Sequence, residues 1–309
     1  MMRRASPDTD QISRSLLQKA VRRGDVQVTQ LVIKHIIQNN DFDWLRKRLA
    51  VVTFEECWIY GSQVSYEKDE KIITFHYSNI AQSVKNKDAA GLGSLAYALS
   101  QGDTSVLSDS YEDKAIKIIA EAIKRPKDFW EWIKKQKVNE RQERIVESAD
   151  KGFRKAGWPW DRAFAQSAAY LSVTTEIPQL TISQVNKNDN FPFWVGIDKH
   201  TAQGKAAIRQ AAKQIEFNAN KALWLAFYFE SAKCNVLQES LWWQKEVSWR
   251  MKKLELSLES GKLIWEKLQP IVKRLLEEDA QQLEEKILKH NPNNNFKSTS
   301  STINQLPLF

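Results

Sequence analysis

Cysteine, histidine, glycine and proline are all scarce in this chain of 309 residues. The two cysteines, Cys57 and Cys234, fall in segments with helical patterns, which indicates neither a disulfide framework nor a thiolate metal site. The histidines have no metal-ligand spacing, so we expect no bound metal; they are His35, His76, His200 and His290. Only 10 glycines and 8 prolines occur, which favours helices over turn-rich β structure.

Long apolar runs are also missing. No window is long and apolar enough to span a membrane, and the first residues, MMRRASPDTDQ, lack the apolar core of a signal peptide. The chain is 42% hydrophobic with a mean hydropathy of −0.52, values typical of a soluble globular protein. We therefore expect a cytoplasmic protein with no membrane partner.

Positive charge and tryptophan are the two features in excess. The 46 lysines and arginines outnumber the 38 acidic residues and give a net charge of +8, which favours polyanionic partners. Twelve tryptophans are more informative, because an indole is costly to expose and marks packing anchors or partner surfaces.

Apolar residues recur at helical spacing through most of the chain. Ser13 and Asp25 stand where the N-caps of the first two helices are expected, and a third helical pattern runs on to Gly61. Pro126 and Pro159 are expected to begin further helices, since proline is tolerated in a first turn. The pattern predicts an all-α, multi-helix bundle.

Three places interrupt this pattern. Residues 72–77 (IITFHY) alternate like a short strand and predict at most a minor hairpin, whereas Pro270 is expected to kink or restart the last helix. The polar, proline-containing residues 181–200 are the best candidate for an internal boundary. We therefore predict a flexible N-terminus (1–12), a helical domain (13–178), a second helical region (179–289) and a disordered C-terminal tail (290–309).

The chain closes with the residues QLPLF, which put an apolar pair after a polar stretch. Such a pair can serve as an anchor for a concave pocket on a partner, although a frayed end is the simpler alternative. The pentapeptide resembles the Gln-Leu-x-Leu-Phe motif with which bacterial polymerases, clamp-loader subunits and repair proteins dock on the sliding clamp. The resemblance implies a bacterial sliding clamp as partner and assigns clamp binding to Gln305, Leu306, Leu308 and Phe309.

Two further stretches resemble the C-terminal helical domain of the RarA/MgsA group of AAA+ ATPases, which are relatives of clamp loaders. The first stretch matches at nine positions: Ser15, Gln18, Lys19, Arg22, Asp25, Asp43, Arg48, Leu49 and Glu55. The second and weaker stretch matches at Ala165, Gln166, Ala168, Tyr170 and Leu171. The resemblance implies a fold of the clamp-loader-collar type and self-association, with a tetramer as the family's oligomer.

The chain departs from this family in one essential respect. It has no Gly-x-x-x-x-Gly-Lys-Ser/Thr loop to cradle the phosphates of a nucleotide, so the ATPase module is missing and we expect no cofactor. A separately encoded ATPase is then a candidate partner. A phage or other mobile element that borrows the host clamp is a candidate origin.

Basic clusters and one helix start are the remaining candidate sites. The clusters either contact DNA phosphates or form ordinary solvated faces; they contain Arg22, Arg23, Arg46, Lys47, Arg48, Lys134, Lys135 and Lys137. His200, Thr201 and Lys205 open a helix, where they either bind an anion or simply cap it. The tryptophans raise the prospect of base stacking. We nevertheless interpret Trp242 and Trp249, with Leu241 and Met251, as a buried helix stripe.

We find no catalytic constellation in the sequence. Glu55 and Glu56 are adjacent on a helix, so we expect their side chains to diverge. The favoured hypothesis is a noncatalytic replication or repair accessory, located at the nucleoid or replisome, that docks on the clamp. Its helical body would self-associate or hold DNA or another replisome protein. The alternative is a clamp-recruited DNA-processing enzyme, such as a nuclease, with an unrecognised active site.

Overall fold

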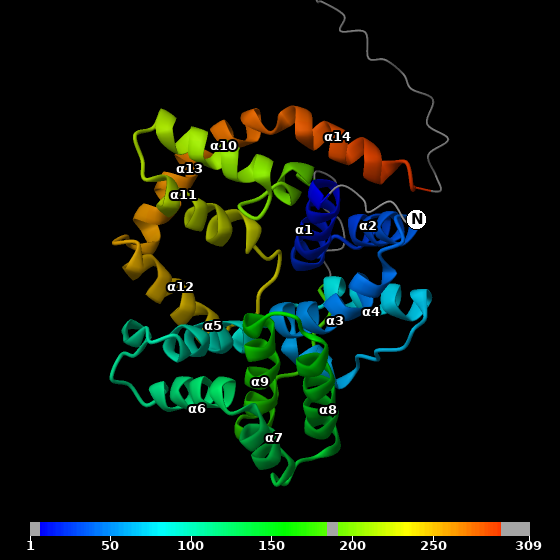
Figure 1. The fold of residues 1–309 in the computed structure, drawn as a ribbon, viewed down its shortest axis with the longest axis vertical. Coiled ribbons are helices and arrows are strands. Elements are labelled where there is room, and N and C mark those ends of the chain that lie inside the picture. The colour runs from blue at the N-terminus through cyan, green and yellow to red at the C-terminus, as the bar shows by residue number, and fades with distance from the viewer. Residues whose placement is uncertain (1–6, 184–190, 292–309) are drawn as a thin grey trace, which may run out of the picture.

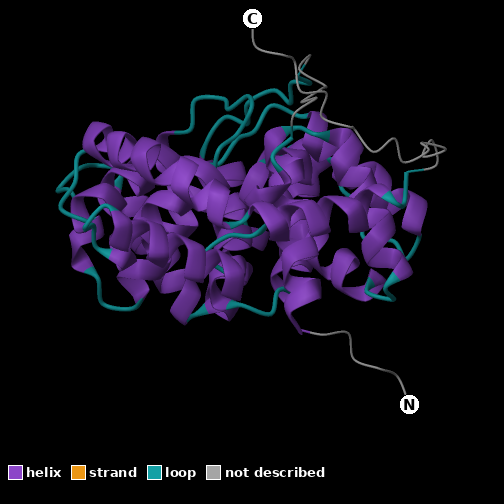
Figure 2. Cartoon of the chain, turned by 90° about the horizontal axis from the view of Figure 1, so that it is seen from above, coloured by secondary structure: helices purple, strands orange, loops and turns teal. Residues whose placement is uncertain are grey.

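The computed structural model describes residues 7–183 and 191–291, and within these ranges the chain is built from α-helices with no β-strand (Figure 2). The first nine helices are α1 (Pro7–Arg23), α2 (Val26–Gln38), α3 (Phe42–Glu56), α4 (Glu70–Gln82), α5 (Asp88–Ser100), α6 (Asp113–Lys124), α7 (Pro126–Lys134), α8 (Glu140–Lys155) and α9 (Pro159–Thr174). Five more follow, namely α10 (Ala202–Gln214), α11 (Ala219–Ala226), α12 (Leu241–Lys253), α13 (Leu258–Leu275) and α14 (Glu277–Leu288). The all-α prediction is confirmed.

Short turns of helix join several of these elements. They are η1 (Trp58–Ser62), η2 (Thr104–Val106), η3 (Phe193–Gly196) and η4 (Phe227–Ser231), of which the last is a π-type turn that continues α11. Figure 1 shows α7, α8 and α9 at one end of the long axis and α10, α13 and α14 at the other. The first helices lie between these two ends.

Helices that are distant in sequence are brought together by packing. α5 packs against α9 and α6 on one side and against α12 on the other, while α1 packs against η3 and α14 packs against α2. The contact between α5 and α12 depends on Gly91, since a Cβ there would lie 2.3 Å from the backbone carbonyl carbon of Trp242. The absence of a side chain lets the two backbones approach closely.

One contiguous apolar core runs through the predicted boundary near residue 178. It includes Leu16 and Leu49 from the first range and Leu225 and Leu268 from the second, each fully buried. A core shared in this way holds the two ranges in fixed relation, because neither can open without exposing apolar surface.

Most helix starts agree with the sequence. Asp25 caps α2, and its carboxylate accepts a hydrogen bond from the amide of Val28. Pro126 and Pro159 occupy the first turns of α7 and α9, which confirms both predictions. Ser13 is not a cap, because α1 already begins at Pro7.

The strand-like interpretation of residues 72–77 is wrong, because these residues lie in the middle of α4. Asp69 caps this helix, and the spacing of the buried residues Ile73, Tyr77 and Ile80 is helical. The alternation misleads because Phe75, although apolar, is 59% exposed. Pro270 lies inside α13, and the helix breaks only at Leu276, where α14 follows.

Candidate functional site

A cavity of about 390 Å³ lies where seven segments of the chain meet, and we call it the inner cavity. Its walls come from α1, α3, α5, α9, α12, the turn at residues 198–200, and α11 with η4. The other hollows described for this chain are each lined by one or two neighbouring elements. A cavity built from such distant segments is the best candidate for a functional site.

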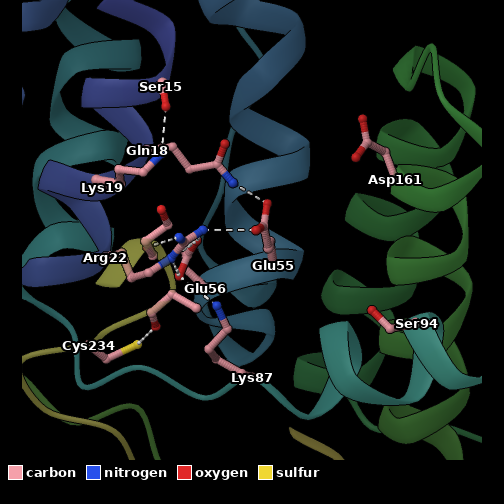
Figure 3. A network of polar contacts seen from close by, with 12 residues as sticks. Ser15, Gln18, Lys19, Arg22, Glu55, Glu56, Lys87, Ser94, Asp161 and Cys234 are labelled. Atoms are coloured by element: carbon pink, nitrogen blue, oxygen red, sulfur yellow. Dashed lines mark hydrogen bonds and ion pairs between the residues drawn. The ribbon is translucent and has the colours of Figure 1, made fainter. Parts of the chain in front are cut away.

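A closed network of charges surrounds Arg22 of α1, and two of its members, Arg22 and Glu55, line the inner cavity. The Nε and Nη2 atoms of Arg22 donate to the carboxylate of Glu56 at 2.6–3.0 Å, and Nη2 also donates to Oε1 of Glu55 at 2.9 Å. Lys87 adds a second cation, with its Nζ 3.3 Å from Oε2 of Glu56 (Figure 3). We call these four residues the Arg22 network.

Arg22 and Glu56 both stay charged, because each is stabilised by neighbouring groups of opposite charge. Burial alone would raise the pKa of Glu56, but Arg22 and Lys87 outweigh it and hold that pKa at about 2. Burial alone would likewise lower the pKa of Arg22, but Glu56 and Glu55 raise it above its usual value. Sequence reasoning expected Glu55 and Glu56 to diverge, and this is wrong, because both carboxylates reach the same guanidinium.

Arg48 of α3 connects the Arg22 network to α9. Its Nη1 donates to Oδ2 of Asp161 at 3.1 Å and its Nη2 donates to Oε1 of Gln18 at 2.9 Å, while Gln18 also donates to Glu55. Figure 3 shows Asp161 on α9 across from these residues. The polar groups of α1, α3 and α9 therefore satisfy one another at this side of the cavity.

A second pair ties α1 to the turn before α10. Lys19 forms a buried ion pair with Asp198 and also donates to Ser15. Burial would raise the pKa of Asp198, but Lys19 and the hydrogen bond from His200 hold it well below its usual range. Burial also lowers the pKa of Lys19. The turn is packed tightly, since a Cβ on Gly204 would lie only 2.0 Å from the carbonyl oxygen of Asp198.

The opposite wall, formed by the 198–200 turn, α11, η4 and α12, is arranged differently. Arg250 lies over the ring of Trp224 with its Cζ 4.0 Å from the ring centroid, and Lys199 places its Nζ 3.6 Å from the same centroid. Tyr228 donates a hydrogen bond to Oε1 of Glu246. We call these five residues the Arg250 cluster.

The charges of the Arg250 cluster are not paired with one another. Among the residues that the structure describes, neither Arg250 nor Lys199 forms an ion pair. Oε2 of Glu246 and Nε of Arg250 are buried there without a hydrogen-bond partner. Burial raises the pKa of Glu246 to about 7 and lowers that of Lys199 to about 7. Buried groups that titrate near neutrality in a cavity are typical of functional sites.

The basic residues singled out from the sequence are scattered. Arg22 and Arg23, expected on a solvated or DNA-facing side of a helix, are both buried. Arg23 pairs with Glu230 of η4. The polar face of α1 is covered because the 193–200 segment and η4 fold over it, which helical periodicity cannot reveal. Contact with DNA phosphates by Arg22 or Arg23 would require these ion pairs to open.

The other candidate cations lie on three different parts of the molecule. Arg46 and Lys47 both pair with Asp43, at 2.7 and 2.6 Å, and these hydrogen bonds hold the pKa of Asp43 at about 2. Arg48 lines the inner cavity. The cations at the end of α7 are exposed and form no ion pair with any described residue; they are Lys134, Lys135 and Lys137.

The three residues of the predicted anion site, His200, Thr201 and Lys205, also lie in different environments. Thr201 is buried and caps α10, and its hydroxyl accepts a hydrogen bond from the amide of Gly204 at 3.1 Å. His200 contributes to the inner cavity with a side chain that is 56% exposed, whereas Lys205 is exposed on α10. Capping is thus the observed role of Thr201.

Sequence reasoning missed the Arg250 cluster. The signal available was Glu246 and Arg250, four residues apart in a stretch rich in tryptophan. The buried-stripe interpretation is confirmed for Trp242, Trp249 and Met251, and it is wrong for Leu241, which is 46% exposed.

Three further expectations concern the clamp-binding pentapeptide, metal binding and membrane-spanning helices. The pentapeptide Gln305, Leu306, Leu308 and Phe309 lies outside them. Within residues 7–183 and 191–291, no group of three or more histidine, cysteine, aspartate or glutamate side chains is placed to hold a metal ion. No helix in these ranges is long and apolar enough to cross a membrane.

Comparison with known proteins found no family model, no curated protein and no solved structure that matches this chain.

Proposed function

We propose that this protein is a noncatalytic DNA replication or repair accessory that docks on the bacterial sliding clamp through Gln305, Leu306, Leu308 and Phe309. The observation that carries the proposal is the pentapeptide QLPLF itself. Leucine and phenylalanine side chains supply apolar anchors for a pocket on a partner, and the glutamine supplies a hydrogen bond at its rim.

The place where the pentapeptide joins the folded body supports this role. The end of α14 is held on α2 by a contact of 2.9 Å between Nδ1 of His35 and Nε2 of His290, and by a hydrogen bond from Lys34 to the carbonyl oxygen of His290. Residues 291–304 separate this anchor from the pentapeptide. A connection of that length can span at most ~50 Å, so a clamp bound at the pentapeptide would stay close to the body.

The helical body is the part that would bring a second partner to the clamp. The net charge of +8 and the exposed cations Lys134, Lys135 and Lys137 favour DNA as that partner. The resemblance to the RarA/MgsA helical domain adds self-association, with a tetramer as the expected oligomer, and a separately encoded ATPase as a further candidate partner. Docking on the clamp would locate the protein at the nucleoid or replisome.

Binding to a purified bacterial sliding clamp tests the proposal. The full chain is expected to bind with micromolar affinity, and the double substitution Leu308→Ala with Phe309→Ala is expected to weaken binding at least about tenfold, because both apolar anchors are lost. Phe296→Ala is a matched control, since it removes an aromatic side chain from the same stretch outside the motif. Equal affinity of all three proteins, or no binding by any, would contradict clamp docking.

The alternative of a clamp-recruited DNA-processing enzyme draws on one observation, the near-neutral titration of Glu246 and Lys199 in the inner cavity. Cleavage of DNA by the full chain, lost in Glu246→Gln, would favour the enzyme over the accessory.

A further inference from the structure

We propose that the inner cavity binds a nucleotide, with its base against the tryptophan faces and its phosphate at Lys199 and Arg250. The proposal concerns the folded body and does not depend on clamp docking. A free nucleotide and a nucleotide unit of single-stranded DNA share this chemistry, and the experiment below separates them.

Flat aromatic surfaces favour a planar ligand. Seven of the lining side chains are aromatic, and they come from α3, α9, α11, η4 and α12: Trp44, Trp160, Phe164, Trp224, Phe227, Tyr228 and Trp243. Rings of this kind stack on nucleobases, and each stack is worth about 1–3 kcal/mol in proteins that bind single strands. The volume of about 390 Å³ is within the range of pockets that hold small ligands.

The charge of the lining favours an anion. Six arginine and lysine side chains line the inner cavity against four acidic ones. The excess is concentrated at Lys199 and Arg250, since the other four cations each have an acidic partner at 4.0 Å or less. Cations held over an aromatic ring, with no carboxylate within 4.0 Å, are suited to a phosphate, which Arg can bind with two parallel hydrogen bonds.

Glu246 gives the second, independent reason to expect a base rather than a simple aromatic anion. Its side chain is buried, and Oε1 is already held by the hydroxyl of Tyr228. Oε2 has no partner among the described residues and is itself buried, so a ligand would reach it only after a shift of the surrounding side chains. Nucleobases carry N–H donors on their edges, and an exocyclic amine there would satisfy this oxygen.

The spatial order of these groups matches the order of groups in a nucleotide. Lys199 and Arg250 lie over the ring of Trp224, and Tyr228 lies between this ring and Trp243, so a base on Trp243 would hold its phosphate near the two cations. Glu246 and Arg250 are one turn apart on α12 and both line the cavity. A single ligand would therefore lie near the aromatic rings, the two cations and the side chain of Glu246.

Isothermal titration of the full chain with deoxyadenosine monophosphate, an oligomer of ten deoxyadenosines and inorganic phosphate tests the proposal. Arg250→Gln and Lys199→Gln each remove one phosphate ligand, and two variants are used because either change can affect folding. Arg209→Gln is the matched control, since Arg209 is exposed on α10 and does not line the cavity. Thermal unfolding of each variant establishes that it is folded.

We expect deoxyadenosine monophosphate to bind, and either cavity variant to weaken it at least about tenfold while Arg209→Gln leaves it unchanged. Binding of the oligomer alone, with the same dependence on Arg250 and Lys199, supports the proposal and identifies a DNA strand as the source of the nucleotide. The proposal is overturned if neither probe binds, if inorganic phosphate binds as tightly as the nucleotide, or if folded cavity variants bind like the wild type.

Discussion

The two sides of the inner cavity differ in how their charged groups are paired. In the Arg22 network, every charge has a partner of opposite sign, and Arg22 alone bonds two carboxylates and the carbonyl oxygen of Ser231. In the Arg250 cluster, two cations rest on an indole ring, and an oxygen of Glu246 has no donor among the described residues. Arg22, Glu56 and Lys87 are buried, whereas Lys199, Trp224 and Arg250 are half-buried, so the unpaired cations lie nearer to solvent than the paired ones.

The difference distinguishes a structural role for the Arg22 network from a ligand-binding role for the Arg250 cluster. A buried pair that loses one member leaves an uncompensated charge, so a closed network resists change. A buried polar atom without a partner costs free energy, and a ligand that supplies the missing partner recovers it. The Arg22 network therefore acts as a structural link between α1, α3 and Lys87. The Arg250 cluster is the part of the cavity lining that we propose binds the ligand.

The substitution Glu56→Gln is expected to have the largest effect, because it removes the carboxylate shared by Arg22 and Lys87. The free energy of unfolding at neutral pH should fall by about 3–5 kcal/mol, as measured by urea denaturation. Because the pKa of Glu56 is about 2 in the folded state, below its ordinary value of 4.5, its contribution is present above pH 4.5 and is lost as pH falls toward 2.

Glu147→Gln is the matched control for this change, since Glu147 is exposed on α8 and forms no ion pair with a described residue. Its effect should lie within about 0.5 kcal/mol. A Glu56→Gln variant as stable as this control would show that the Arg22 network does not hold the fold.

Gly204→Ala is expected to have an intermediate effect. Its Cβ would lie 2.0 Å from the carbonyl oxygen of Asp198, so the turn that carries Lys199 and pairs with Lys19 must shift. We expect a loss of about 1–3 kcal/mol in unfolding free energy, together with weaker nucleotide binding. Gly157→Ala is the control, because nothing lies within 4 Å of a Cβ at Gly157. Equal behaviour of the two variants would mean that the turn is not tightly packed.

An effect of similar size but opposite sign is expected for Glu246→Gln, and it should change with pH. The pKa of Glu246 is raised to about 7 by burial, so the stability associated with its neutral form is present below about pH 4.5 and is lost as pH rises through 7. A glutamine stays neutral and can still accept from Tyr228. The variant should therefore match the wild type near pH 4.5 and exceed its unfolding free energy by about 1–3 kcal/mol at pH 8.

Comparison of the variant with the wild type at each pH isolates the contribution of Glu246 and of the groups that interact with it. Groups that do not interact with Glu246 cancel in the difference, whereas Lys199, Arg250 and Lys87 interact with its carboxylate in the wild type alone and are part of the effect. A difference that stays constant between pH 4.5 and 8 would contradict the raised pKa.

Local patterns were enough to predict much of the fold. The helical spacing of apolar residues and the prolines at 126 and 159 gave the all-α class and several helix starts. The prediction of a strand at residues 72–77 failed because one exposed aromatic residue, Phe75, imitates the alternation of a strand. The prediction of an N-cap at Ser13 failed because capping residues also occur inside helices.

The inner cavity could not be predicted in the same way, because its contacts join segments far apart in the chain. Periodicity identifies a polar face on α1 but does not say whether solvent or η4 covers it. Arg22 meets Ser231, and Lys19 meets Asp198, only through the tertiary fold. A pair such as Glu246 and Arg250 is visible in the sequence, but whether its members bond each other or a ligand depends on the surrounding elements.

The most direct test of the contrast between the two walls is the unfolding free energy of Glu56→Gln and Glu246→Gln measured side by side at pH 8. Both changes replace one buried carboxylate by an amide of the same shape. The account predicts opposite signs, with Glu56→Gln less stable than the wild type and Glu246→Gln more stable. Losses of similar size in both variants would show that the two walls do the same work, and would contradict the account.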